Sequence, residues 1–511
     1  MKFITKYILI LVIGTMLIGC DSYLEEDPKS ITSPDTFFNT IEEFELAIVG
    51  LYDTWGQDYL HGSIGLYRFT ENGADIVGPN RNFGQVEQIM SYSLSESTID
   101  AVYWNSGAPK TWQGLYSIIL NTNTILSKLE LNDVISQANK DVIEAETLFH
   151  RAYAYYYLTN LWGDVPYYRE NLPISEVQAL PRTDKKTIRD EILVDLQKAQ
   201  LSLPSSINSD NFGKVSKWVA ATVMVKIYLI QNKWQQARDK SLEIINDSPH
   251  RLLDEYASVF RLDNEYNEEI IWSTDFGKDL VQDHGYGNDW VDHFTPRIRD
   301  EPKESSKKAE LSAALAARNE GFTGYGLQIP LPDFVKKFPL DDLRRASNIT
   351  TEYLGYELNF PYMPKRWNLD QINSPRGNHA DNKLIFRLAD VYLMAAEAEN
   401  ELNGPTSAYQ YINKVRERAF EPDQPLSGLS KDDFRLAMYD ERKWELAAEG
   451  ERRMDLIRWG ILLDVVKNTE YRVYDPAPNI KPRHVLLPIP TEEFILNPAL
   501  LDSDPTNNGY R

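Results

Sequence analysis

The sequence predicts a mostly α-helical protein, a scaffold of packed helical hairpins with long irregular loop or subdomain insertions and a few short strands. Apolar residues repeat at helical spacing over long stretches in both halves of the chain. Two segments, 56–107 and 273–383, instead collect glycines, polar residues and aromatic residues with little periodicity. A chain of 511 residues is long enough to bury a large core.

The N-terminus has the pattern of an exported lipoprotein. Two lysines precede an apolar run that ends at Ile18, and this run is shorter than the roughly 20 residues of a membrane-spanning helix. It ends in LIGC, which resembles a bacterial lipobox, and Cys20 is the only cysteine of the chain. We expect residues 1–19 to be a signal peptide, Cys20 to be lipidated, and residues 20–40 to form a tether to the membrane. The alternative is an ordinary signal peptide with an incidental cysteine.

The composition narrows the classes of partner. Lys and Arg number 54 and Asp and Glu number 76, so the net charge is −22. This charge repels polyphosphate, and nucleic acid is therefore not an expected partner. After Cys20 the chain contains no cysteine for a disulfide, so its stability must come from the size of its core.

The N-terminal half contains the first predicted hairpin. Residues 219–245 have two apolar stripes separated by a short polar turn, with Ala237 early in the second stripe. A small side chain at that place lets two antiparallel helices approach closely, as in tetratricopeptide (TPR) repeats, although the full repeat signature is absent. Amphipathic segments at 144–162 and 184–203 predict further helices of this scaffold.

The second predicted hairpin lies in the C-terminal half. Apolar positions follow helical spacing through residues 385–403. Gly404 can adopt the left-handed conformation that ends a helix, and Pro405 suits the first turn of the next one. Ala408 then takes the place that Ala237 has in the first hairpin.

Two conspicuous runs are expected to be structural. The tyrosines within residues 153–157 are predicted to pack between helices rather than to form a sugar platform. In the charged run at 440–460, Gly450 marks a break or a close approach between helices. Three pairs of opposite charge in this run have helical i, i+3 spacing: Arg442 with Glu445, Glu449 with Arg452, and Asp455 with Arg458.

Four segments in this order resemble the SusD/RagB family of outer-membrane nutrient-binding lipoproteins. They are AETLFHRAYAYYYLTNLWGDVPYY at 145–168, RLADVYLMAAEAENELNG at 387–404 with INKVRERA at 412–419, DERKWELAAEGERRMDLIRWG at 440–460, and LLPIPTEEFILNPAL at 486–500. The resemblance covers nearly the whole chain, from the lipobox to the C-terminal tail. The tail reads TNNGY where the family usually has a sequence close to QNPGY.

The resemblance implies a function as well as a SusD-like fold. Such a protein faces the cell exterior, is held to the outer membrane by its lipid anchor, and acts as a binding lid over a SusC-like TonB-dependent transporter. The family most often binds oligosaccharides, binds peptides in some branches, and has no catalytic activity. We therefore expect a nutrient glycan as ligand and no cofactor, within an N-terminal region 41–260 and a C-terminal region 261–511.

Two other functions stay open at this point. The first is the same scaffold binding peptides or another nutrient. The second is a secreted hydrolase, although Ser63 lacks the glycine spacing of a nucleophile elbow. A pair of carboxylates for glycoside hydrolysis depends on spatial separation, which a sequence does not reveal.

The binding residues are expected in two loops, 78–84 and 284–290. A sugar ring has polarised C–H groups on its face and hydroxyls on its rim, so it suits a flat aromatic ring and planar polar groups. We expect the aromatic face from Phe83, Tyr286 and Trp290, and the hydroxyl partners from Arg81, Asn82 and Asn288. The alternative is that the loop aromatics are tucked into the core.

The second of these loops also contains the nearest approach to a metal-ligand cluster. Its acidic and histidine residues are Asp283, His284, Asp289, Asp292 and His293. The spacing matches no metal-binding motif such as H-E-x-x-H, and we expect no metal there.

Overall fold

The computed structural model confirms a mostly α-helical chain. It describes residues 37–81, 87–99, 107–208, 211–276, 288–319, 324–366, 377 and 379–511. The signal peptide, Cys20 and most of the predicted tether therefore lie outside the described residues. Within the described residues, no helix combines the length and the apolar character that crossing a membrane requires.

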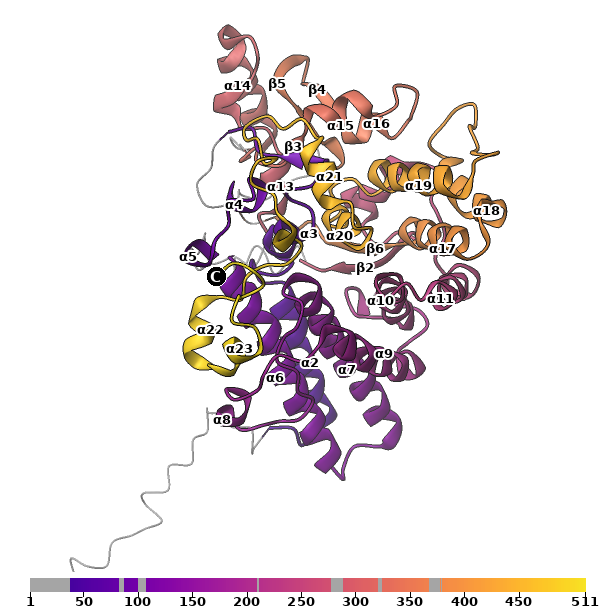
Figure 1. Cartoon of the computed structure of the whole chain (residues 1–511). Coiled ribbons are helices and arrows are strands. Elements are labelled where there is room, and N and C mark those ends of the chain that lie inside the picture. The colour runs from indigo at the N-terminus through magenta and orange to yellow at the C-terminus, as the bar shows by residue number, and fades with distance from the viewer. Residues whose placement is uncertain are drawn as a thin grey trace, which may run out of the picture.

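The N-terminal helices pack side by side in the lower part of Figure 1. Short connections join α6 to α7 and α10 to α11, as in antiparallel hairpins. The predicted hairpin at 219–245 and the predicted helices at 144–162 and 184–203 are confirmed. The bounds are α2 Ile41–Trp55, α6 Ala108–Leu131, α7 Gln137–Leu161, α9 Lys185–Ser202, α10 Lys217–Ile230 and α11 Trp234–Asp247.

The C-terminal hairpin continues this array. Helix α17 contacts α10, α11, α18 and α19. Gly404 has φ +83° between α17 and α18, and Pro405 is the first residue of α18, as predicted. Ala237 and Ala408 are both fully buried, which fits their role as small contact residues. The bounds are α17 Leu388–Asn403, α18 Pro405–Arg416 and α19 Lys431–Glu445.

The two irregular segments contain short elements. The strands form three two-stranded antiparallel sheets in the part of the chain that the structure describes. The pairs are β1 Val77–Gly78 with β3 Ile329–Pro330, β2 Ile270–Thr274 with β6 Lys383–Arg387, and β4 Thr350–Tyr353 with β5 Tyr356–Tyr362. Because β2 and β6 flank the segment 273–383, their pairing holds the two ends of this segment together.

Short helices complete the chain. Those in the irregular segments are α3 Gly65–Thr70, α4 Glu87–Met90, α5 Glu96–Ile99, α13 Trp290–Phe294, α14 Lys308–Asn319, α15 Pro332–Lys337 and α16 Arg345–Asn348. The others are α8 Ile174–Val177, α20 Arg452–Arg458, α21 Leu462–Lys467, α22 Thr491–Leu496 and α23 Ala499–Ser503. The 3₁₀ helices are Tyr256–Phe260, Leu262–Asn264, Ile298–Asp300, Ser305–Lys307, Pro364–Arg366 and Pro482–Val485.

The largest hydrophobic core joins the helical hairpins to the sheet of β2 and β6. Tyr153 is fully buried in it and packs against Trp55, Phe149 and Trp272. The packing role predicted for the tyrosines of α7 is therefore confirmed. This core takes residues from both sides of position 260, and the boundary that the sequence suggests there stays a prediction.

The charged run at 440–460 is not one continuous helix. Helix α19 ends at Glu445 and α20 begins at Arg452, with Gly450 at φ +84° between them. Of the three predicted pairs, only that of Asp455 and Arg458 forms, at 2.8 Å. The break removes the helical spacing of Glu449 and Arg452, whereas Arg442 and Glu445 both lie within α19 but contact other partners. The other two predicted pairs are wrong, since Glu445 and Glu449 contact arginines of other elements and Arg442 and Arg452 contact aspartates.

Candidate functional site

The described part of the first predicted loop, residues 78–81, starts at the end of β1 and is held by Arg81. The Arg81 Nη1 atom donates hydrogen bonds of 2.9 Å to Asn80 Oδ1 and to the carbonyl oxygen of Tyr325. It also lies 3.6 Å from a carboxylate oxygen of Asp300. The guanidinium group of Arg81 thus ties the described start of this loop to the segments of Tyr325 and Asp300. Asn82 and Phe83 lie outside the described residues.

Asn288, in the second predicted loop, is fully buried and holds the end of this loop. Its side-chain amide donates to the carbonyl oxygens of His379, at 3.1 Å, and Asp381, at 2.8 Å. Its Oδ1 atom accepts a hydrogen bond of 3.0 Å from the backbone of Trp290. The expectation that Asn288 reaches the hydroxyls of a ligand is corrected, because these backbone contacts occupy its side chain. Tyr286 lies outside the described residues.

Trp290 belongs to a core rather than to an exposed face. Its side chain is only 6% exposed, and its ring meets Tyr67 edge-on at 4.6 Å and Phe294 at 4.9 Å between centroids. The ammonium group of Lys383 lies 4.1 Å from the ring centroid. The expected exposed ring is corrected, because α13 turns Trp290 and Phe294, one helical turn apart, to the same buried side.

The acidic and histidine residues around α13 pair with one another. His293 Nε2 lies 3.4 Å from Asp289 Oδ2, and His379 Nε2 lies 3.2 Å from Asp292 Oδ1. Burial opposes ionisation of Asp289, but His293 and Ser63 outweigh it and lower the pKa of this carboxyl. In the described ranges, no group of three or more such side chains is arranged to hold a metal ion. Asp283 and His284 lie outside those ranges.

The structure reveals an exposed aromatic pair that the sequence analysis missed. Phe212 and Tyr266 stack with ring centroids 3.8 Å apart and an interplanar angle of 7°. Their side chains are 39% and 41% exposed, which is high for large aromatic residues. Phe212 precedes α10 and Tyr266 precedes β2, and the Tyr266 hydroxyl donates to Asp275 at 2.8 Å.

A groove of about 300 Å³ lies beside this pair, and both rings line it. Arg251 and Glu268 form an ion pair on its wall, with Nη2 and Oε1 2.9 Å apart. Burial lowers the pKa of His250, another lining residue, and its Nδ1 atom lies 3.2 Å from the carbonyl oxygen of Glu268. A neutral imidazole that donates there keeps Nε2 as a hydrogen-bond acceptor. The groove therefore combines flat apolar rings with planar polar groups.

The described end of the second predicted loop is connected to this pair through residues 381 and 382. Asp275, the partner of Tyr266, is followed by Phe276, whose backbone N–H donates to Asn382 Oδ1 at 2.9 Å. Within the loop, Asn288 donates to the carbonyl oxygen of Asp381. The loop that the sequence selected and the exposed pair therefore belong to one region of the molecule.

A sequence signal for the missed residue does exist. Asn211-Phe212-Gly213 repeats the N-F-G pattern of Asn82-Phe83-Gly84, which the sequence analysis selected. Gly213 has φ +82°, a conformation that favours glycine, so the turn after Phe212 depends on this residue. Phe212 and Phe83 each precede a glycine within a polar run. The sequence pattern therefore makes both of them candidates for a ligand contact.

The helical hairpins and the external aromatic groove define a class of mostly helical binding proteins. Two family models match the chain: one described as the SusD family, over residues 344–510, and one described as starch-binding and associating with the outer membrane, over residues 23–229. A SusD-like protein of Formosa agariphila is 50% identical over 510 residues, which cover 96% of this chain and 97% of that protein. The chain belongs to the SusD family, as its sequence motifs predicted.

Solved structures confirm the fold. A SusD homolog from Bacteroides thetaiotaomicron aligns with a TM-score of 0.77 at 21% identity, over 93% of this chain and 99% of that chain. Surface glycan-binding protein A from Bacteroides uniformis aligns with a TM-score of 0.74 at 21% identity, over 92% and 100%. A laminarin-binding SusD-like protein aligns with a TM-score of 0.72 at 23% identity, over 89% and 97%.

Proposed function

We propose that this protein is a cell-surface lipoprotein that binds a nutrient oligosaccharide and delivers it to a SusC-like TonB-dependent transporter. The observation that carries the proposal is the exposed pair of Phe212 and Tyr266 beside a groove of about 300 Å³. The names of relatives support a carbohydrate ligand, since one binds laminarin and another is a complex with laminarihexaose. Peptides or another nutrient are the alternative ligand.

The groove suits weak binding without turnover. The outer faces of the two rings accept the C–H face of a sugar, while His250 and the Arg251–Glu268 pair accept and donate hydrogen bonds at its rim. An exposed sugar gives up well-hydrated hydroxyls for partly solvated partners, so we expect a dissociation constant between about 1 μM and 1 mM. The function is binding, and we expect the ligand to leave unchanged.

The residues that the sequence selected have two roles in this proposal. Phe83 and Tyr286 remain proposed aromatic contacts of the ligand, and Asn82 and Arg81 remain proposed partners of its hydroxyls. Trp290 and Asn288 support the region from beneath, because both are buried and Asn288 holds the loop end. The proposal thus moves the sugar-stacking role from Trp290 to Phe212 and Tyr266.

The proposed location is the outer face of the outer membrane, through a lipid on Cys20. The family whose description says that it associates with the outer membrane supports a location at this membrane. A lid over a transporter mouth needs a large permanent interface, which buries about 2,000 Å² or more. Co-purification in mild detergent tests this part, and a protein always recovered alone from cells that express its neighbouring transporter would overturn it.

Calorimetry tests the binding site. After a glycan array has supplied a ligand, we expect Phe212→Ala and Tyr266→Ala each to weaken binding by about 1–3 kcal/mol, as loss of an aromatic anchor does. Tyr439→Ala is the matched control, because Tyr439 also stacks on a ring, that of Trp459 at 3.8 Å, but does not line the groove. Unchanged affinity in both groove variants would show that the ligand binds elsewhere on the protein.

Two further results would change the function itself. Release of shorter sugars from a polysaccharide by the purified protein would establish a hydrolase. Binding of peptides in place of any glycan would establish the peptide alternative. Chromatography of the ligand before and after incubation distinguishes turnover from binding.

A further inference from the structure

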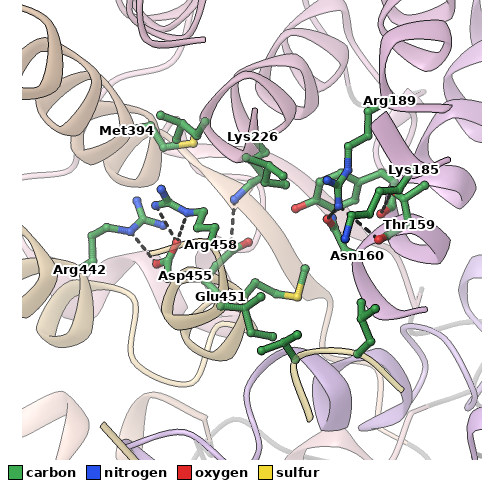
Figure 2. A pocket seen from close by; sticks show the side chains of 17 residues that line it. Thr159, Asn160, Lys185, Arg189, Lys226, Met394, Arg442, Glu451, Asp455 and Arg458 are labelled. Atoms are coloured by element: carbon green, nitrogen blue, oxygen red, sulfur yellow. Dashed lines mark hydrogen bonds and ion pairs between the residues drawn. The ribbon is translucent and has the colours of Figure 1, made fainter. Parts of the chain in front are cut away.

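A separate cavity of about 150 Å³ lies among the helices (Figure 2). Its walls come from the end of α7, the start of α9, the end of α10, α17, α19 and α20. It shares no lining residue with the aromatic groove. At about 30 Å³ per water molecule, it has room for a small polar ligand.

On one wall of this cavity, the lysine and arginine side chains form ion pairs with carboxylates. Lys226 lies 2.7 Å from a carboxylate oxygen of Asp390 and 2.9 Å from one of Glu451. Arg442 and Arg458 share Asp455, at 2.7 Å and 2.8 Å. Every cation on this wall therefore already has a carboxylate partner.

The opposite wall contains two cations without such partners, Lys185 and Arg189. In the part of the chain that the structure describes, no carboxylate lies within ion-pair distance of either. Arg189 instead donates from Nη2 to the carbonyl oxygen of Thr159 at 3.2 Å and to Asn160 Oδ1 at 2.8 Å, as Figure 2 shows. Burial lowers the pKa of Arg189, because nearby negative charges offset only part of the cost of burying its positive charge.

The nearest acids do not neutralise this wall directly. Asp164 Oδ1 accepts a hydrogen bond of 2.9 Å from the backbone of Lys185. Asp184 caps α9 by accepting from the backbone of Lys186, at 2.9 Å, and of Thr187, at 3.1 Å. Both carboxylates are thus used by backbone donors, and they act on the two cations only over longer range.

Asn160 adds an unused donor to the same wall. Its side chain is 7% exposed, and its Nδ2 atom has no hydrogen-bond partner among the described residues. Because its Oδ1 atom accepts from Arg189, Nδ2 is the amide end that stays available. A buried donor without a partner costs about 1–3 kcal/mol, so such a group points to a missing acceptor.

We propose that this cavity binds a small oxyanion, a sulfate, phosphate or carboxylate group, held by Arg189, Lys185 and Asn160. The three side chains line one space. Arg189 uses only its Nη2 atom for acceptors among the described residues, and Asn160 Nδ2 has no acceptor among them. A guanidinium group suits two oxygens of such an anion, and the ammonium group adds a point charge. The proposal does not depend on the glycan groove.

Equilibrium dialysis with radiolabelled sulfate tests the site, at constant ionic strength set with sodium chloride. We expect saturable binding of about one ion per chain and a saturable rise in melting temperature. Arg189→Gln and Lys185→Gln should each raise the dissociation constant at least about tenfold, a loss of about 1.4 kcal/mol. Lys186→Gln is the matched control, because Lys186 is one residue away, carries the same charge and does not line the cavity.

The outcomes separate the site from general salt effects. Equal binding by wild type, Lys185→Gln and Lys186→Gln, or a rise in melting temperature that never saturates, would overturn the proposal. Lys185→Gln keeps the test valid if Arg189→Gln does not fold. Binding of free sulfate or phosphate alone identifies an inorganic ion as ligand, whereas equal binding of methyl sulfate or acetate identifies an anionic group carried by a larger molecule.

Discussion

At the residue scale, Glu445 shows how this chain keeps charges inside a core. The carboxylate is fully buried and accepts hydrogen bonds from Arg344 at 2.7 Å, Arg387 at 2.6 Å and Arg418 at 2.8 Å. Burial alone would raise its pKa, but the three guanidinium groups outweigh burial and hold the pKa well below its ordinary value. Each of the three cations also contacts a second carboxylate: that of Asp342 for Arg344, of Glu449 for Arg387 and of Glu269 for Arg418.

Removing the charge of Glu445 should therefore destabilise the protein strongly. We expect Glu445→Gln to lower the free energy of unfolding by about 3–5 kcal/mol at neutral pH, because three buried arginines lose the one carboxylate that they share. Because the folded-state pKa is depressed, this stabilisation is present above the ordinary carboxyl pKa of 4.5 and is lost as pH falls below it. Urea unfolding at several pH values measures it. Glu352→Gln, at an exposed position, should change stability by less than about 0.5 kcal/mol.

Trp290 marks the limit of sequence reasoning about single residues. The sequence identified a loop rich in aromatic and polar groups, but exposure depends on which face the local backbone presents to the core. At position 290 that face is buried, and at position 212 it is exposed, although the N-F-G pattern around Phe212 also occurs at Phe83. Local patterns therefore locate candidate loops better than they identify the residues that contact a ligand.

The burial of Trp290 predicts a stability effect. Trp290→Ala should lower the free energy of unfolding by about 3–5 kcal/mol, because it leaves a cavity among Tyr67 and Phe294. Phe212→Ala should cost about 1 kcal/mol, the scale of one exposed aromatic contact. Denaturant titration of both variants measures the difference. A Trp290→Ala protein as stable as the wild type would contradict the buried position.

At the element scale, the hairpins were predictable because helical periodicity and helix ends are local properties. Gly404 and Pro405 separate α17 from α18 where the sequence places the junction. The charged run was less predictable, since its periodicity continues through the break at Gly450. The partners of Glu445, Glu449 and Arg452 come from other elements, and no spacing rule within one helix identifies them.

Two glycine substitutions should have opposite effects on helix stability. Gly404→Ala should destabilise the protein by about 1–2 kcal/mol, because φ is +83° there, a left-handed conformation that is costly for residues with a Cβ atom. Gly50→Ala, within α2, should stabilise it by about 0.5–1 kcal/mol through helix propensity. Neither added Cβ atom would meet another atom within 4 Å, so backbone conformation alone sets both signs. Thermal melts of both variants measure these changes in stability. A change in the same direction for both variants would contradict the argument from backbone conformation.

At the scale of the whole molecule, the order of motifs along the chain predicted the family and the fold, but not the position of the groove. The groove arises where Phe212, before α10, meets Tyr266, before β2. These residues are more than 50 positions apart. Their approach follows from the core that joins the hairpins to the sheet of β2 and β6, and this is a property of tertiary packing.

The lipid anchor is the last prediction, and it concerns where this molecule works. Each buried methylene of an acyl chain contributes about 0.8 kcal/mol, so more than one chain on Cys20 would hold a chain with net charge −22 stably to a membrane. We expect Cys20→Ala to leave the precursor unprocessed or to release the protein from the outer membrane, as measured by cell fractionation and electrophoretic mobility. Tyr266→Ala, which alters the groove alone, should remain in the membrane fraction. If the Cys20→Ala protein fractionates with the outer membrane at the wild-type level in cells without a partner transporter, a contact other than the lipid holds it there.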